Sequence, residues 1–190
     1  MQTTTIRNGA ARALATLLVI AAPAFADGSR RLPPIIHADN ATGVSETFST
    51  TGAIDVANPF FRSLGGNGRA CVTCHQPSAA WTITTENVRA RFDATGGTDP
   101  IFRTNDGSVS PDADVSSVAA RREAYAMLLD KGLIRVGIGV PADAEFELVA
   151  VDDPYGYAHA DELSLFRRPL PSANLKFLST VMWDGRETFK

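Results

Sequence analysis

The chain of 190 residues has few of the residues that bind metals or form cross-links: two cysteines, three histidines and three methionines. It has no excess of basic residues, because 18 lysines and arginines stand against 21 acids and the formal net charge is −3. This balance argues against a nucleic-acid partner. The remaining composition, 44% hydrophobic and 21% charged, is that of a globular protein and excludes a collagen-like or disordered chain.

The N-terminal segment has the composition of an export signal. Arg7 and Arg12 are followed by an apolar run over residues 13–22 and then by Ala24-Phe25-Ala26, whose small residues mark a cleavage site. A membrane anchor is the alternative, but the run is shorter than the roughly 20 residues that span a bilayer, and Pro23 closes it. We therefore expect a signal peptide over residues 1–26, cleaved near Ala26, no stable membrane span, and a periplasmic or otherwise exported protein.

The two cysteines stand in the run Cys71-Val72-Thr73-Cys74-His75. This spacing is typical of covalent c-type haem attachment, in which each thiol adds to a haem vinyl group and the adjacent histidine binds the iron. Two residues between the thiols place both sulfurs at the edge of one porphyrin. The sequence thus predicts one haem c per chain, with Cys71 and Cys74 as thioether positions and His75 as the axial iron ligand.

Two cysteines have three other common uses. A thioredoxin-like redox pair follows a strand, whereas the approach here is the glycine-rich run 65–70. A structural zinc site needs four ligands, and His37 and His159 are the only further histidines. A plain disulfide is compatible with export but gives no role to His75. Haem attachment is favoured because c-type haem is attached outside the cytoplasm, and the export signal is an observation independent of the motif.

Local patterns predict a mainly α, cytochrome c-like helical haem domain with an inserted β-hairpin. Residues 27–56 read as an extended lead-in, and residues 57–190 as the haem domain. Helices are expected near 58–61, over 85–95 and over 115–131. The alternation of apolar residues over 134–140 and 146–150 predicts the two strands of the hairpin.

The sequence allows two interpretations for each of several side chains. Phe60 and Phe61 are either walls against the haem or ordinary core residues. Trp81 either packs on the haem edge or bonds a propionate, or else it is structural. Arg122 lies near the middle of an apolar helix face, where it either reaches a propionate or extends over that face to solvent.

Two stretches resemble one family. Residues 58–61 with 67–77, and the run Met182-Trp183-Asp184-Gly185-Arg186-Glu187, are similar to the first haem domain of the dihaem cytochrome c peroxidase and MauG-like family. The resemblance is close in these segments and loose over the rest of residues 27–190. It implies a two-domain enzyme in which the first haem meets hydrogen peroxide. It further implies that a second haem delivers electrons from a redox partner such as a small cytochrome, with Trp183 as an electron-transfer residue.

The chain also departs from that family. It has one haem motif, it has no histidine between His75 and His159, and it ends at Lys190, before the acidic residue that assists peroxide cleavage in the family. We therefore expect a haem domain truncated at its C-terminal end. A stand-alone monohaem cytochrome c that carries electrons is the alternative.

The sixth iron position has four candidate ligands, each of which is more readily interpreted as a packing or surface residue. The candidates are His37, Met127, His159 and Met182. Thioether ligation suits an electron carrier, whereas an open position suits peroxide or another small ligand. The sequence favours weak or absent protein ligation on this side of the iron.

Overall fold

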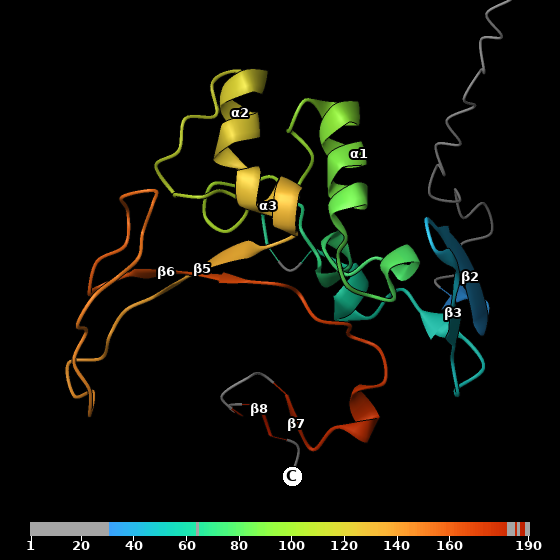
Figure 1. The fold of residues 1–190 in the computed structure, drawn as a ribbon. Coiled ribbons are helices and arrows are strands. Elements are labelled where there is room, and N and C mark those ends of the chain that lie inside the picture. The colour runs from blue at the N-terminus through green and yellow to red at the C-terminus, as the bar shows by residue number, and fades with distance from the viewer. Residues whose placement is uncertain (1–30, 64, 182–184, 186, 189–190) are drawn as a thin grey trace, which may run out of the picture. The chain divides into compact units, whose positions relative to one another are not determined.

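The structure, a computed structural model, describes residues 31–63, 65–181, 185 and 187–188 (Figure 1). The predicted signal peptide and Trp183 lie outside the described residues. The helices are α1 (Thr85–Thr95), α2 (Val118–Ala124) and α3 (Ala126–Lys131), with short 3-10 helices η1 (Pro59–Phe61), η2 (Cys71–Thr73), η3 (Pro77–Ala79) and η4 (Leu175–Phe177). The strands are β1 (Arg31–Leu32), β2 (Ile35–Asn40), β3 (Gly43–Phe48), β4 (Ile54–Asp55), β5 (Ile134–Ile138), β6 (Leu163–Arg167), β7 (Thr180–Val181) and β8 (Glu187–Thr188).

The prediction of a mainly α fold is wrong. The described α-helices have only 11, 7 and 6 residues, and the strands form four two-stranded antiparallel sheets. The helix predicted over 115–131 begins late because the Ser117 side chain accepts a hydrogen bond from the Ala120 N–H and caps α2. It then breaks at Tyr125, whose backbone leaves the helical region. No described helix is long and apolar enough to cross a membrane.

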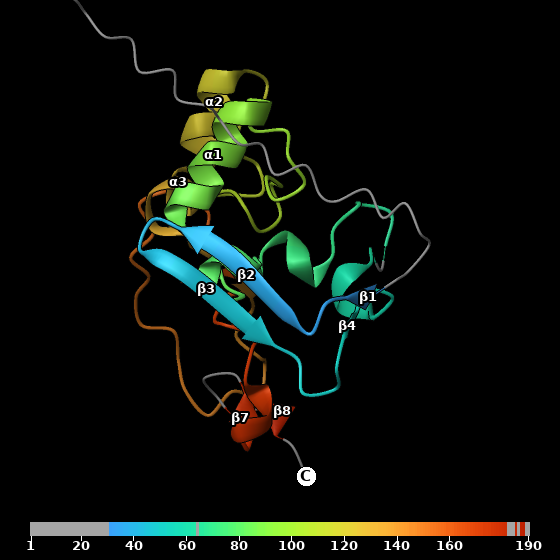
Figure 2. The same ribbon diagram turned by 90° about the vertical axis from the view of Figure 1, so that its right-hand side faces the viewer.

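The segment expected to be an extended lead-in contains four of the strands. β2 and β3 form a hairpin in register from the pair Ile35 and Phe48 to the pair Asn40 and Gly43 (Figure 2). The Asn40 side chain accepts hydrogen bonds from the backbone and the hydroxyl of Thr42, which closes the turn. Polar residues dominate the hairpin, so apolar periodicity gave little signal for it.

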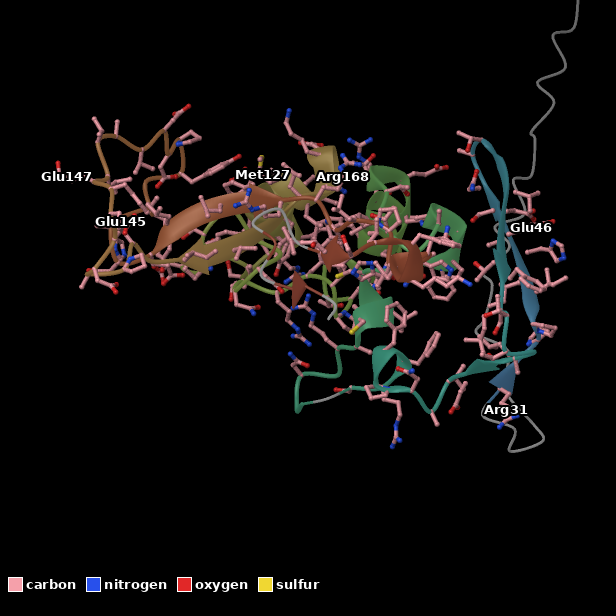
Figure 3. The ribbon with its side chains drawn as sticks, turned by 90° about the horizontal axis from the view of Figure 1, so that it is seen from below. Arg31, Glu46, Met127, Glu145, Glu147 and Arg168 are labelled. Carbon is pink, nitrogen blue, oxygen red and sulfur yellow. The ribbon has the colours of Figure 1, made fainter. Side chains whose placement is uncertain are left out.

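The predicted hairpin over 134–150 is right in its first strand and wrong in its second. β5 pairs with β6, and the apolar side chains of Phe146 and Leu148 are exposed outside any strand. A Cβ on Gly137 would lie 2.2 Å from an oxygen of Glu162, so the glycine permits the chain before β6 to approach closely. Glu145 and Glu147 lie at the outer end of the long β5–β6 connection (Figure 3).

The core lies between the helices and the segments that lead into them, with α1 beside α3 (Figure 1). Its buried residues are Ile83, Val88, Phe92, Ile101, Phe102, Tyr125, Leu128 and Leu129. Cys74, a residue of the candidate haem motif, packs against this cluster. The core therefore supports the motif directly, which connects the stability of the helices to the geometry of the site.

One loop of the β5–β6 connection should respond to acid. The Asp153 carboxylate accepts backbone hydrogen bonds from Ala158, Tyr155 and Tyr157, and these bonds lower its pKa. Because the folded pKa is depressed, the stabilisation is complete above the ordinary aspartate value of about 3.9 and is lost as pH falls through the lowered pKa. We expect the Ala158 amide proton resonance to titrate with a midpoint below about 3.9. Asp153→Asn should remove this titration, and a midpoint above the ordinary value would contradict the assignment.

Candidate haem-binding site

The Cys71–His75 motif is a single helical turn. The His75 N–H donates to the Cys71 carbonyl at 3.0 Å, and the Cys74 N–H donates to the same carbonyl at 3.2 Å. Residues at positions i, i+3 and i+4 of such a turn share one face. Both thiols and the imidazole therefore leave the backbone from the same face, which is the arrangement that two thioethers and an axial ligand on one porphyrin require.

The start of the turn is fixed by a reciprocal pair of hydrogen bonds. The Ala70 N–H donates to the Thr73 hydroxyl at 3.0 Å, and the Thr73 N–H donates to the Ala70 carbonyl at 2.9 Å. The Arg91 guanidinium, which is ion-paired with Asp99, donates to the Thr73 carbonyl at 2.6 Å. These bonds hold Thr73, the residue just before Cys74, in place.

The two thiols are not bonded to each other and lie in different environments. Cys71 is exposed, whereas Cys74 is half-buried against the core. Burial raises the pKa of the Cys74 thiol, and the positive charge of Arg69, whose Nη2 lies 3.9 Å from Cys74 Sγ, opposes that shift. Cys71 is thus open to reagents in solution, and Cys74 is positioned by its packing.

Arg69 is itself held by a partly buried ion pair. Its Nη1 lies 2.8 Å from both carboxylate oxygens of Asp106, and the two side chains are 15% and 28% exposed. Burial lowers the pKa of Arg69, but the hydrogen bond and the negative charge of Asp106, with smaller contributions from Cys74, outweigh it, so the pKa is raised. A charge-assisted pair of this kind fixes side-chain geometry, so Arg69 keeps a stable position beside Cys74.

The ring of His75 is oriented by a backbone carbonyl. Its Nδ1 lies 2.7 Å from the Trp81 oxygen. A carbonyl only accepts hydrogen bonds, so Nδ1 must carry the proton. In the neutral imidazole, Nε2 then keeps its lone pair, which is the form that binds a metal ion. With Nδ1 engaged in this way, Nε2 is the ring nitrogen with a free lone pair.

The Trp81 carbonyl reaches His75 because the chain turns back sharply after the motif. Ala80 and Trp81 both adopt left-handed backbone conformations, with φ of 52° and 61°, each costing about 1–2 kcal/mol for a residue with a Cβ. Two backbone hydrogen bonds of Gln76 close the return: its N–H donates to the Thr82 carbonyl at 2.9 Å, and its carbonyl accepts from the Trp81 N–H at 2.8 Å. Two strained residues in succession at a candidate ligand point to a functional constraint.

An aromatic cluster of Phe60, Phe61 and Trp81 reaches the imidazole through Phe60. The Phe60 centroid lies 6.0 Å from that of His75 and 5.7 Å from that of Trp81, and Phe61 lies 6.0 Å from Trp81. Asn58 caps the short helix that carries both phenylalanines, because Asn58 Oδ1 accepts a hydrogen bond from the Phe60 N–H at 2.9 Å. These rings provide apolar surface next to the histidine.

The indole of Trp81 has a structural role. It is 7% exposed, and its Nε1–H donates to the Thr47 hydroxyl of β3 at 2.7 Å. Its donor is therefore already used within the protein. The Arg122 guanidinium lies over the Phe92 ring at 4.5 Å and pairs with Asp93 at 3.1 Å, so it extends over the apolar face to solvent.

The described candidates for the sixth iron position do not converge on the motif. His37, on β2, pairs with Glu46 at 2.8 Å. His159 is half exposed and faces Tyr157, while Met127 lies half-buried on α3. Met182 lies outside the described residues, as does the predicted electron-transfer residue Trp183. In the described part of the chain, no three side chains of the His, Cys, Asp and Glu types gather as metal ligands do.

Sequence reasoning missed several residues that position the motif. They are Arg69, Arg91, Asp106 and Ser172. Asp106 and its partner Arg69 are 37 positions apart, so no local pattern pairs them. The Trp81 carbonyl had no sequence signal, since a backbone group is present at every position.

Comparison with protein-family models, with curated proteins and with solved structures finds no match for this chain. The interpretation of the site therefore depends on the Cys71–His75 motif and on the contacts around it.

Proposed function

We propose that this chain is an exported c-type haem protein that transfers electrons. In this proposal, Cys71 and Cys74 hold one haem through thioether bonds, and His75 binds the iron through Nε2. The observation that carries the proposal is the hydrogen bond from His75 Nδ1–H to the Trp81 carbonyl at 2.7 Å. This hydrogen bond leaves Nε2 as the metal-binding nitrogen. A disulfide or a thiol redox pair would not require an oriented histidine.

The attachment chemistry fits the state of the two thiols. In each addition, the sulfur bonds to one carbon of a vinyl group and the thiol hydrogen passes to the other, so no external oxidant is required. Exposed Cys71 is accessible to the attachment machinery, and half-buried Cys74 is held beside Arg69. The bound haem supplies the one-electron redox chemistry. The protein contributes the axial nitrogen and the apolar side chains next to it.

The finer form of the proposal follows from the family resemblance. It assigns to this haem the reduction of hydrogen peroxide, with electrons arriving from a small cytochrome through a second haem domain and Trp183. The Phe60–Phe61–Trp81 cluster supports a haem pocket of either kind, because a peroxidase and an electron carrier both need apolar side chains that keep water from the axial histidine. The alternative to the peroxidase is thus a stand-alone electron carrier, and an experiment must distinguish the two.

The test is to produce the full chain with an export pathway and a haem c maturation system. We expect one haem per chain that resists extraction by acidified acetone and gives a c-type pyridine haemochrome spectrum. A colourless product with two titratable thiols would disprove the proposal. High-spin ferric haem that reacts with hydrogen peroxide would support the peroxidase, and a six-coordinate low-spin haem inert to peroxide would support the carrier.

A further inference from the structure

The Trp81 carbonyl accepts hydrogen bonds from two different parts of the chain. His75 Nδ1 lies 2.7 Å from it, the backbone nitrogen of Ser172 lies 3.0 Å from it, and the Ser172 hydroxyl lies 3.3 Å from it. A carbonyl oxygen has two lone pairs. Three donors therefore share two acceptor positions, and each bond is weaker than it would be alone.

Ser172 is brought to this carbonyl by a segment that we call the strap, residues 168–172. At its start, Arg168 Nη2 donates to the Lys131 carbonyl at the end of α3. The Thr82 hydroxyl then donates to the Pro169 carbonyl. Pro169 and Pro171 restrict the backbone on both sides of the exposed Leu170. The strap is thus anchored before Ser172, and the two donors of Ser172 are held at Trp81.

The strength of the bond from His75 to Trp81 controls how strongly the imidazole donates electrons to a metal. A strong hydrogen bond from Nδ1–H gives the ring more imidazolate character and raises its basicity. A more basic ligand stabilises ferric over ferrous iron and lowers the reduction potential, which hydrogen bonding around the ligands is known to adjust. Donors that compete for the same carbonyl weaken the bond and act in the opposite direction.

We propose that Ser172 is a positioning residue that raises the reduction potential of the haem by sharing the Trp81 carbonyl with His75. This inference rests on the proposed function and adds to it the residue that adjusts the ligand. The effect requires no contact between Ser172 and the haem. It is transmitted through one backbone oxygen, whose position depends on the strained turn at Ala80 and Trp81.

The experiment compares the wild-type holoprotein with Ser172→Ala and with Ser172→Thr. Alanine removes the hydroxyl donor and keeps the backbone N–H, whereas threonine keeps both donors. We expect the potential of Ser172→Ala, measured by optical redox titration, to be more negative than that of the wild type, and the potential of Ser172→Thr to match the wild type. In the ferrous protein, the His75 Nδ1 proton resonance should move downfield in Ser172→Ala, which reports the stronger hydrogen bond independently of the potential.

Two results would overturn the inference. One is a Ser172→Ala potential equal to or above that of the wild type, and the other is an equal shift in Ser172→Thr. The failure of the proposed function would be distinct, because the wild-type protein itself would then carry no covalent haem. A wild-type protein that carries haem, together with an unshifted Ser172→Ala variant, removes the inference alone.

Discussion

Replacing both Cys71 and Cys74 by serine should reduce covalently bound haem from one per chain to none. A serine hydroxyl does not add to a vinyl group, so neither thioether can form. His75 would remain, and any haem bound through it alone would be extracted by acidified acetone. The measurement is haem staining after denaturing electrophoresis, together with the absorbance of the extracted protein. Covalent haem retained by the double variant would contradict the assignment of the motif.

The single variants provide the matched controls. Cys71→Ser removes an exposed thiol and should leave one thioether at Cys74, with the pyridine haemochrome band displaced to longer wavelength than in the wild type. Cys74→Ser should show the same displacement, with lower recovery of folded protein, because it places a hydroxyl against the apolar core. If both variants show the same displaced haemochrome band but only Cys74→Ser gives less folded protein, both cysteines form thioethers and only Cys74 also contributes to packing.

The parts of the fold that the sequence predicted correctly are those set by local chemistry. Helix α1 has the expected bounds because the Thr84 hydroxyl accepts the Asn87 N–H at 3.2 Å and Gly96 ends the helix in a left-handed conformation. Val88 and Phe92, four positions apart on this helix, are both fully buried. In these cases, the residues that decide the structure lie within a few positions of one another.

The errors concern contacts between distant residues. The partner of β5 was expected to be the next apolar segment, but the close approach permitted by Gly137 favours β6. The helical pattern over 115–131 did not contain the break at Tyr125, a residue that packs beside Phe102 in the core. Each of these outcomes depends on packing that forms only when the whole chain folds.

The candidate site combines both kinds of information. The spacing of Cys71, Cys74 and His75 predicted the ligand set, since one helical turn places them on one face. The elements that hold this turn are distant in sequence: Arg91 is 18 positions from the Thr73 carbonyl, and Ser172 is 91 positions from Trp81. In the proposed function, the motif supplies the atoms that bind the haem, and residues distant in sequence orient them.

Phe92→Ala should lower the free energy of unfolding by about 3–5 kcal/mol. Phe92 is 1% exposed and meets Phe102 edge to face at a centroid distance of 5.3 Å. The ring is tightly enclosed: a Cβ on Gly97 would lie 2.6 Å from it, and Arg122 lies over its face. Its removal should therefore leave a cavity in the core. Urea unfolding followed by circular dichroism, performed on the haem-free chain, gives the difference.

Phe146→Ala is the matched control for this prediction. Phe146 is 64% exposed on the β5–β6 connection, so its truncation should change the free energy of unfolding by no more than about 0.5 kcal/mol. Equal effects of the two substitutions would refute the assignment of Phe92 to the core. Because Cys74 packs against the same cluster, a loss confined to Phe92→Ala should also reduce the yield of haem-bearing protein, through a motif that is less often held in its helical turn.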